Sequence, residues 1–384
     1  MTAAGSGGTR ALILTGGGAR AAYQIGALLA INRLRGKSKR NPFPIICGTS
    51  AGAINAAGLA CQADNFRQAT GSLNTFWRHM RTADIYRVDA ASVAAAGARW
   101  LAVLTTGWLT GRAPRSLLDN APLASLLKRH IDFPGIERSI ESRALRALNI
   151  TASGYDSSES INFFQAPPEV LPWQRSQRLG LRTILGTEHL LASSAIPFIF
   201  PAVRIHREYF GDGSMRQFAP LAPAIHLGAD RLLVIGATRA SEQRRRGEYG
   251  DSDYPSLAQI AGHALSSIFL DGLSVDIERI QRINRTLAAM PEALRQQQGV
   301  SLRPIETLVI SPSQSLDRIA AEQASSLPWT IRKLLGGLGA MNPQGGALTS
   351  YLLFEKNFTR RLIDLGYADT LAQSEAVGSF LELT

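Results

Sequence analysis

Cysteine is scarce in this sequence, which has only Cys47 and Cys61 among its 384 residues. Cys47 falls on a predicted buried strand, and Cys61 lies near the far end of the predicted helix that follows. At 1.5 Å per helical residue, roughly 15 Å or more separates them, which excludes a disulfide between them. Unpaired thiols suit a reducing compartment, so we expect a cytoplasmic protein.

Acidic residues are absent from the first 63 positions, whereas seven Arg or Lys residues fall there. These residues contribute to a formal net charge of +11 at pH 7. A basic surface favours anionic partners such as membrane headgroups. We therefore expect an anionic membrane surface as a partner, with peripheral association at the inner membrane. Nucleic acid is not expected, because no recognised binding motif accompanies the charge.

Secretory, membrane-spanning and metal-binding patterns are also lacking. Residues 1–9 are small and polar, which predicts a disordered tail rather than a signal peptide. Residues 41–63 carry no charge, but Pro42, Pro44 and Asn55 argue against a membrane span there. Because no His, Cys, Asp or Glu residues have metal-ligand spacing, the sequence predicts neither a metal site nor a cofactor.

A glycine triplet follows the first apolar run, at residues 11–14. The segment reads Gly16-Gly17-Gly18-Ala19-Arg20 and leads into a predicted helix. Successive glycines let backbone N–H groups turn toward a bound anion, and the helix N-terminus adds to that field. The pattern predicts an oxyanion-binding loop formed by Gly16, Gly17 and Gly18.

The same triplet also fits a dinucleotide-binding pattern, Gly16-x-Gly18-x-x-Ala21. That fold requires an acidic residue roughly 20 positions further on, to bind the ribose hydroxyls. The first acidic residue in this chain is Asp64, which makes an NAD site a weak interpretation. An NADP site, with Arg in the ribose-binding role, stays open.

A second glycine-flanked turn reads Gly48-Thr49-Ser50-Ala51-Gly52. It lies between a short apolar run at 43–47 and an Ala-rich helical stretch at 53–63. The G-x-S-x-G motif in a strand–turn–helix context places its serine at the tip of a strained turn, as a nucleophile. An ordinary strand-to-helix turn produces the same pattern, so this motif alone does not decide between the two.

A third segment, Asp212-Gly213-Ser214, offers a carboxylate as base for Ser50. Taken alone, it is equally a hairpin turn. A histidine base is the alternative, and the order Ser, acid, His makes His226 and His263 candidates. Only about two strands precede Ser50, fewer than an α/β-hydrolase needs. We therefore interpret the histidines as surface or structural residues and predict a Ser–Asp dyad.

Taken together, these segments resemble the patatin-like phospholipase family. The resemblance covers the chain from about residue 10 to about residue 240. Residues 192–201 resemble the family's segment upstream of its catalytic aspartate, and residues 350–354 and 362–367 resemble bacterial members. Two positions depart from the family pattern, since Ser214 follows Asp-Gly and Ala202 follows Pro201.

The resemblance implies a three-layer α/β/α fold with a mostly parallel central sheet and a helical cap or insertion. It implies lipid acyl hydrolysis without calcium, on phospholipids or other acyl esters. Ser50 would be the nucleophile and Asp212 the base. Gly16, Gly17 and Gly18 would form the oxyanion loop, and Arg20 would help to order it.

Two alternatives keep the same fold. One is an esterase, thioesterase or polyester depolymerase that acts on other acyl substrates. The other is a non-catalytic signalling module, against which the intact Ser50 and Asp212 count.

The domain organisation follows from these assignments. We expect a tail at 1–9, a hydrolase domain at 10–365 with a variable insertion at about 82–135, and an extension at 366–384. Further strands are predicted at 145–153, 160–164, 231–236 and 306–310, and further helices at 64–79, 186–194, 256–290 and 351–365.

Two segments are candidate lids. The first is residues 92–109, which carry Trp100 and Trp108 and would form a lid, a membrane anchor or a core helix. The core interpretation is preferred, because apolar helices mostly belong to cores. The second is the Gly-rich segment 336–346.

Overall fold

The computed structural model describes residues 8–110, 116–237, 257–337 and 346–383. The strands are β1 (Arg10–Leu14), β2 (Ile45–Thr49), β3 (Ala147–Gly154), β4 (Ser160–Gln165), β5 (Trp173–Arg175), β6 (Arg178–Arg182), β7 (Val203–Ile205), β8 (Glu208–Asp212), β9 (Arg231–Ile235) and β10 (Glu306–Ile310). The helices are α1 (Ala22–Leu34), α2 (Ala51–Ala60), α3 (Phe66–His79), α4 (Thr82–Ile85), α5 (Ala90–Thr110), α6 (Ala121–His130), α7 (Phe133–Glu141), α8 (Thr187–Ser193), α9 (Ala222–His226), α10 (Leu257–Ala289), α11 (Glu292–Gln297), α12 (Leu316–Gln323), α13 (Trp329–Gly337), α14 (Gly346–Leu352), α15 (Lys356–Ala372) and α16 (Ser374–Leu381). Short 3-10 turns are η1 (Gly18–Ala21), η2 (Gly213–Arg216) and η4 (Ala324–Ser326).

One mixed sheet organises the chain, with the strand order β10-β9-β1-β2-β3-β4-β6-β5. The strands from β10 to β3 are all parallel, whereas β4 and β8 both run antiparallel to β3. β2 pairs with β3 as far as Thr151, and β8 pairs with β3 from Ala152 onward. Because β4 occupies the other side of β3, β8 continues the position of β2 beyond its end.

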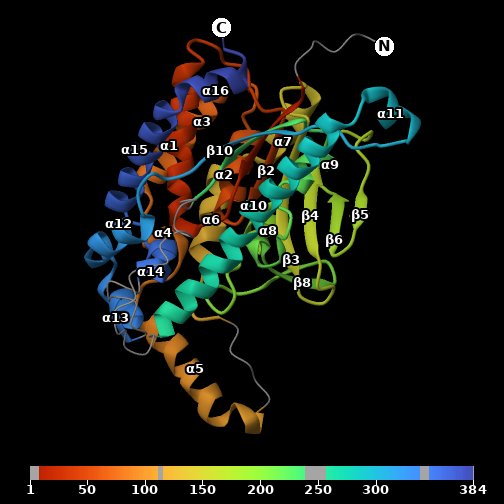
Figure 1. The fold of residues 1–384 in the computed structure, drawn as a ribbon. Coiled ribbons are helices and arrows are strands. Elements are labelled where there is room, and N and C mark those ends of the chain that lie inside the picture. The colour runs from red at the N-terminus through yellow and green to blue at the C-terminus, as the bar shows by residue number, and fades with distance from the viewer. Residues whose placement is uncertain (1–7, 111–115, 238–256, 338–345, 384) are drawn as a thin grey trace, which may run out of the picture.

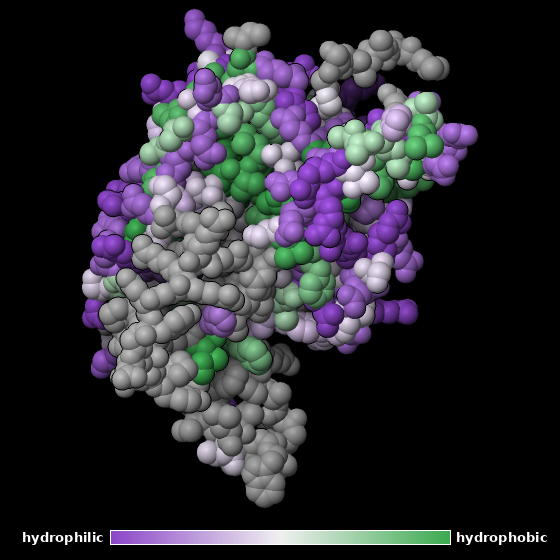
Figure 2. Space-filling model, viewed as in Figure 1, coloured by the Kyte–Doolittle hydropathy of each residue, from purple (hydrophilic) through white to green (hydrophobic). Residues whose placement is uncertain are grey.

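Helices cover both faces of the sheet, which gives the three-layer α/β/α fold (Figure 1). Alternating side chains of a strand point to opposite faces. In β1, Leu12 and Leu14 pack into a large core with α1, α2, α3 and α15, whereas Ala11 and Ile13 pack with α9 and α10. Hydrophilic residues cover the outer surfaces of α12 and α15 (Figure 2).

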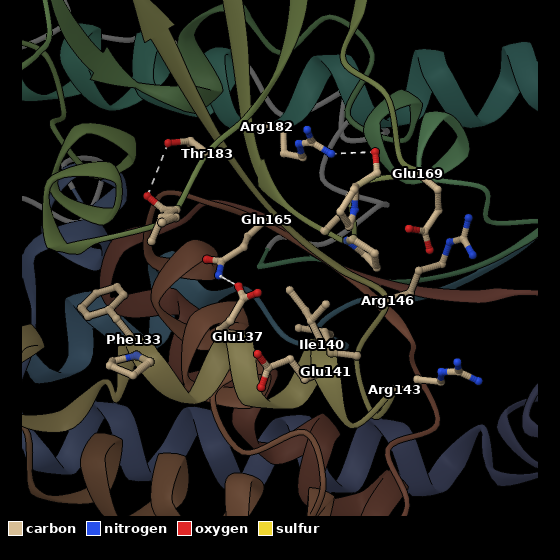
Figure 3. A pocket seen from close by; sticks show the side chains of 16 residues that line it. Phe133, Glu137, Ile140, Glu141, Arg143, Arg146, Gln165, Glu169, Arg182 and Thr183 are labelled. Atoms are coloured by element: carbon tan, nitrogen blue, oxygen red, sulfur yellow. Dashed lines mark hydrogen bonds between the residues drawn. The ribbon is translucent and has the colours of Figure 1, made fainter.

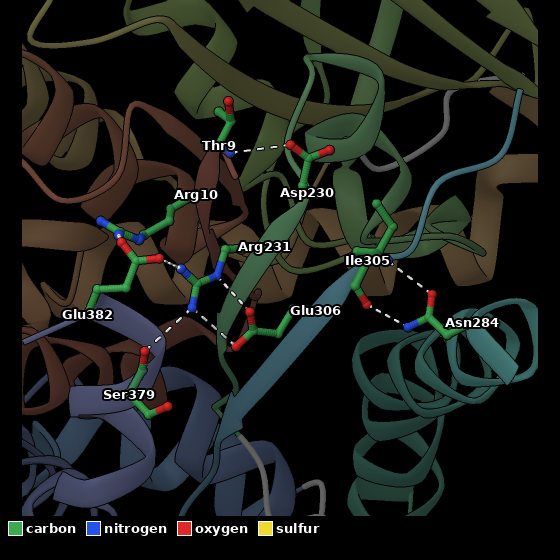
Figure 4. A network of polar contacts seen from close by, with 9 residues as sticks. All are labelled: Thr9, Arg10, Asp230, Arg231, Asn284, Ile305, Glu306, Ser379 and Glu382. Carbon is green, nitrogen blue, oxygen red and sulfur yellow. Dashed lines mark hydrogen bonds and ion pairs between the residues drawn. The ribbon is translucent and has the colours of Figure 1, made fainter. Parts of the chain in front are cut away.

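A polar network fastens the amino ends of β9 and β10 to the helices around them (Figure 4). Arg231 Nε lies 2.6 Å from Glu306 Oε2, and the same guanidinium pairs with Glu382, which follows α16. Asn284 of α10 donates to the backbone oxygen of Ile305 at 2.7 Å. The end of the chain is therefore tied directly to the sheet.

The predicted division at 365/366 falls within α15, where Leu365 and Gly366 are both buried. The domain boundaries stay predictions. The predicted insertion at 82–135 contains α4, α5 and α6 and the start of α7. Of these, α5 projects away from the body (Figure 1). The side chains of Trp100 and Trp108 lie outside the described residues, as do 338–345 of the second candidate lid and 1–7 of the predicted tail.

Two sequence expectations can be compared with the structure directly. Cys47 and Cys61 are both buried and free, which confirms that they form no disulfide. In the part of the chain that the structure describes, no helix combines the length and the apolar character needed to cross a bilayer.

Candidate active site

The sheet brings the three predicted segments to one edge. β1 and β2 are parallel neighbours, with Leu14 opposite Gly48, so the glycine triplet and the elbow both leave the sheet at the carboxyl ends of adjacent strands. Asp212 ends β8 and pairs with Ala152, one residue past the position where Thr49 meets Thr151. The shared neighbour β3 therefore places Asp212 next to Ser50.

Ser50 occupies a strained turn between β2 and α2. Its φ of 56° and ψ of −131° lie in a region that residues other than glycine rarely adopt. Gly52 permits the close packing behind the turn, because a Cβ there would lie 2.3 Å from the backbone oxygen of Leu14. The strain and the close approach agree with a nucleophile elbow.

Ser50 and Asp212 form a direct hydrogen bond. Ser50 Oγ donates to Asp212 Oδ2 at 2.6 Å, and the Ser214 backbone N–H donates to Asp212 Oδ1 at 2.9 Å. Burial raises the pKa of Asp212 to about 6, although the hydrogen bonds from Ser50 and Ser214 oppose the shift. The carboxyl group is therefore suited to accept a proton near neutral pH.

Ser193 supports the elbow from behind. Its Oγ accepts a hydrogen bond from the Ser50 backbone N–H at 2.8 Å and donates to the Thr151 backbone oxygen at 2.6 Å. It thus links the nucleophile to β3, the strand that also holds Asp212. Sequence reasoning gave Ser193 no role, although it lies within the family-like segment 192–201.

The glycine triplet presents unpaired donors. In the described part of the chain, the backbone N–H groups of Gly16, Gly17 and Gly18 make no hydrogen bond. Gly18 has a φ of +55°, and a Cβ there would lie 2.3 Å from the backbone oxygen of Tyr351. Gly18 also lines the cavity beside Ser50. The triplet can therefore supply N–H groups to an oxyanion.

Arg20, at the end of this loop, makes its contacts with helices from the C-terminal part of the chain. Its side chain is buried, with Nε donating to Ser350 Oγ at 2.7 Å and the guanidinium pairing with Asp317. The guanidinium also lies 4.0 Å from the ring centre of Tyr351. These partners belong to α12 and α14, so the Arg20 side chain ties the turn after the glycine triplet to both helices.

The two candidate histidines lie elsewhere in the fold. His226 stacks on Trp173, with ring centres 5.2 Å apart, and burial lowers its pKa. His263 is exposed on α10. In the described residues, neither Ser50 nor Asp212 has a histidine as a hydrogen-bond partner. This arrangement agrees with the interpretation of both histidines as surface or structural residues.

A small apolar cavity of about 30 Å³ lies beside Ser50. Its lining comes from the elbow, α3, α6 and the segment after α8, and includes Ile54, Phe76, Met80, Leu123, Ile196 and Phe200. Ser194 also lines it, and the Ser194 hydroxyl is buried without a hydrogen-bond partner among the described residues.

A larger cavity, of about 1070 Å³, lies between α7, β4 and β6 (Figure 3). Its lining includes Glu137 and Gln165, whose side chains are 2.6 Å apart. Gln165 pairs with Leu148 near the amino end of β3, whereas Asp212 pairs near the carboxyl end. The larger cavity is thus at the opposite edge of the sheet. We assign the candidate site to the small cavity, because Ser50 lines it and Asp212 is hydrogen-bonded to Ser50.

The sequence of this chain matches a protein-family model over residues 12–225, described as "Patatin-like phospholipase". The chain belongs to the patatin-like phospholipase family. The matched region contains the glycine triplet, the elbow and Asp212 of this patatin-like protein. A comparison of this chain with curated protein sequences found no match.

Solved structures show a more distant similarity. The chain is similar to human GIVD cytosolic phospholipase A2 in complex with methyl gamma-linolenyl fluorophosphonate, at 14% identity and a TM-score of 0.44. That match covers 98% of this patatin-like chain and 59% of the human one. VipD from Legionella pneumophila matches at 12% identity and a TM-score of 0.31, over 93% of this chain and 67% of VipD.

Proposed function

We propose that this protein is a lipid acyl hydrolase that cleaves carboxylic ester bonds of phospholipids or related lipids through a Ser50–Asp212 dyad. The proposal rests above all on the 2.6 Å hydrogen bond from Ser50 Oγ to Asp212 Oδ2 at the strained elbow. Family membership supports it. The apolar cavity beside Ser50 supports a hydrocarbon chain rather than a polar substituent on the substrate carbonyl.

The reaction would proceed in two stages. Ser50 Oγ attacks the ester carbonyl carbon while its proton passes to Asp212. The tetrahedral intermediate then collapses, the bond to the alcohol oxygen breaks, and Asp212 returns the proton to the leaving alcohol. In the second stage Asp212 takes a proton from water, and the resulting hydroxide attacks the acyl-enzyme. Loss of Ser50 Oγ, which regains its proton, releases the fatty acid.

Charge on the carbonyl oxygen would be stabilised by the unpaired N–H groups of the glycine triplet. One such donor is typically worth about 3–4 kcal/mol in the transition state. The amino end of α2, which begins directly after Ser50, adds a favourable field for negative charge.

Neither stage needs a metal ion. In the described residues, no group of three or more His, Cys, Asp and Glu side chains is arranged to hold one. We therefore propose calcium-independent hydrolysis, which should continue unchanged in excess EDTA. Because a lipid ester is held in an aggregate, we also propose peripheral contact with an anionic membrane surface.

Fluorophosphonate labelling, followed by a panel of ester substrates, tests the proposal. The wild-type protein should be labelled covalently at Ser50 and should hydrolyse phospholipid and p-nitrophenyl esters. Ser50→Ala should lose both properties by several orders of magnitude while keeping its circular dichroism spectrum, and Ser153→Ala, at a buried serine that does not line the cavity, serves as a matched control. Labelling at another residue, or near-normal turnover by Ser50→Ala, would overturn the dyad. If the protein hydrolyses only thioesters or polyesters, the proposed substrate class of lipid esters would be wrong.

A further inference from the structure

An aromatic side chain stands exposed directly beside the catalytic cavity. Phe198 is 75% exposed, although it lies midway between Ile196 and Phe200, which both line that cavity. Its φ of 64° is unusual for a bulky residue. Its backbone oxygen accepts a hydrogen bond from the Leu117 N–H at 2.8 Å. Residues 196–200, here called the anchor loop, thus hold an apolar ring outward on a fixed backbone.

The hairpin that follows presents an amphipathic face. Arg204 of β7 and Tyr209 of β8 are cross-strand partners, and both side chains are exposed. Their neighbours Ile205 and Phe210 point the other way, into the core. Arg207 is exposed at the turn. Exposed Tyr and Arg residues together are typical of the boundary between lipid headgroups and acyl chains.

A second exposed phenylalanine lies close to the elbow. Phe218 is 58% exposed and follows Gln217, whose Nε2 donates to Thr49 Oγ1 at 2.8 Å. Thr49 immediately precedes the nucleophile. The Asp212 N–H donates to the Ala195 backbone oxygen at 2.9 Å, which places the start of the anchor loop beside the end of β8, and the Tyr155 N–H, just after β3, donates to the Tyr209 backbone oxygen at 3.0 Å. All three exposed aromatic residues therefore belong to segments at the carboxyl ends of β2 and β3. β8 lies at this edge, the end of the molecule from which α5 projects (Figure 1).

We propose that the anchor loop, the β7–β8 hairpin and Phe218 form one docking surface for an anionic lipid bilayer. Phe198 would enter the acyl-chain region, and Arg204 and Arg207 would contact lipid phosphates. The proposal rests on the lipid acyl hydrolase function and specifies the surface that meets the substrate.

Continuity with the catalytic cavity favours lipid over a protein partner. The residues on both sides of Phe198 line the cavity, so an acyl chain would pass from the bilayer to Ser50 along the anchor loop. The charge of the β7–β8 hairpin also favours an anionic lipid surface. The exposed hairpin residues Arg204 and Arg207 are basic, and the carboxylate of Glu208 accepts a hydrogen bond from the Ser157 N–H at 2.7 Å.

Vesicle co-sedimentation in a Ser50→Ala background tests the apolar contact, since this background leaves the vesicles intact. Phe198→Asn should weaken binding to phosphatidylglycerol–phosphatidylcholine vesicles by about tenfold, the effect of losing one buried aromatic side chain. Asn is chosen because it tolerates a positive φ better than most other residues that carry a side chain. Ile184→Asn is the matched control, because Ile184 is 82% exposed at the opposite edge of the sheet.

The charge contribution has its own pair of variants. Arg207→Gln should weaken binding to the anionic vesicles by about fivefold and leave binding to pure phosphatidylcholine unchanged. Arg285→Gln, on the exposed side of α10, should change neither. If Phe198→Asn lowers thermal stability, Phe218→Asn carries the same test.

The outcomes separate this inference from the proposed function. The docking surface would be overturned if the Phe198→Asn and Ile184→Asn proteins bound vesicles equally well. Where Phe198→Asn fails to fold, undiminished vesicle binding by Phe218→Asn would overturn it. Hydrolysis of a soluble ester by the protein with intact Ser50 would still leave the hydrolase proposal standing. Conversely, a wild-type protein that binds vesicles through Phe198 but hydrolyses no ester loses only the proposed chemistry.

Discussion

Ser50 Oγ lies 2.6 Å from Asp212 Oδ2, and that carboxyl group is fully enclosed by protein. Burial disfavours the charged form of Asp212 and raises its pKa to about 6, against an ordinary value of 3.8. The burial that would make Asp212 a base near neutral pH therefore carries a cost in stability, which the hydrogen bond from Ser50 partly offsets. Each pKa unit corresponds to about 1.4 kcal/mol, so the ionised base costs the folded state about 3 kcal/mol at neutral pH.

Asp212→Asn should abolish activity and stabilise the fold at pH 8. The amide cannot take a proton from Ser50, so ester hydrolysis should fall by several orders of magnitude. It also removes a buried charge, so the free energy of unfolding should rise by about 1–3 kcal/mol. The folded-state pKa is raised, so the cost of Asp212 is absent below pH 4 and develops as the pH rises from about 4 to 6. Urea unfolding should show that Asp212→Asn raises the free energy of unfolding less at pH 5 than at pH 8. A lower free energy of unfolding at both pH values would show that the buried charge of Asp212 does not destabilise the fold.

The pH–rate profile should report the same carboxyl group. The dyad needs Asp212 ionised, so kcat/KM for a soluble ester should rise with pH and level off above about 6. Rates measured between pH 4.5 and 8 provide the test, with the circular dichroism spectrum recorded at each pH to confirm folding. A flat profile down to pH 4.5 in folded protein would remove Asp212 from the role of base.

Local patterns in the sequence were enough to predict which segments meet at the candidate site. The glycine triplet, the elbow and Asp212-Gly213 each follow a strand, and glycine marks the backbone positions that only it tolerates. Helix 256–290 was also predicted well, as α10 shows. The predicted helix at 351–365 was wrong in its start, because α14 ends at Leu352 and α15 begins at Lys356.

Contacts between distant parts of the chain left no local signal. Ser193 meets Ser50 across 143 positions, and Arg20 meets Asp317 across 297. The short outer strands β5, β6 and β7 were missed as well, since they contain too few residues for a periodic pattern. The family-like segment 192–201 was the one sequence feature that led toward Ser193.

Arg20→Met should weaken both the fold and the reaction. It removes the buried partner of Asp317 and Ser350. Breaking a fully buried ion pair typically costs about 3–5 kcal/mol, and the cost here should be smaller because the Asp317 side chain is 30% exposed. The looser glycine loop should lower kcat by at least about tenfold. Arg20→Lys should recover part of both losses, because Lys keeps the charge but cannot make the same forked contact. If the Arg20→Met protein is destabilised but keeps a normal kcat, Arg20 stabilises the fold without positioning the glycine loop for the reaction.

Ser194→Ala should lower activity with little effect on stability. The Ser194 hydroxyl is buried beside Ser50 and has no hydrogen-bond partner among the described residues, so the fold gains little from it. A hydroxyl aimed into the cavity can bind the substrate ester, and its loss should reduce kcat/KM by about tenfold. Ser153→Ala is the matched control, because the Ser153 hydroxyl is also buried and unpaired but does not line the cavity. Equal kcat/KM values for the two variants would leave Ser194 without a role.

The cavity beside Ser50 should limit acyl-chain length. Its volume of about 30 Å³ is near that of one water molecule, whereas binding pockets for small molecules typically enclose roughly 300–1,000 Å³. An acyl chain must therefore displace lining side chains, and a larger cavity should favour longer chains. Met80→Ala, at a buried lining position, should raise the ratio of kcat/KM for a decanoyl over a butyryl p-nitrophenyl ester.

Stability has to be separated from cavity shape in that experiment. Met80→Ala should cost about 2–5 kcal/mol, as large-to-small core substitutions do. Leu73→Ala is the matched control, because Leu73 is equally buried on α3 but does not line the cavity. It should lower stability by a similar amount without changing the ratio of rates. If Met80→Ala and Leu73→Ala shift the ratio alike, general loosening of the fold rather than cavity volume controls the preference for acyl-chain length. The acyl chain would then bind outside this cavity.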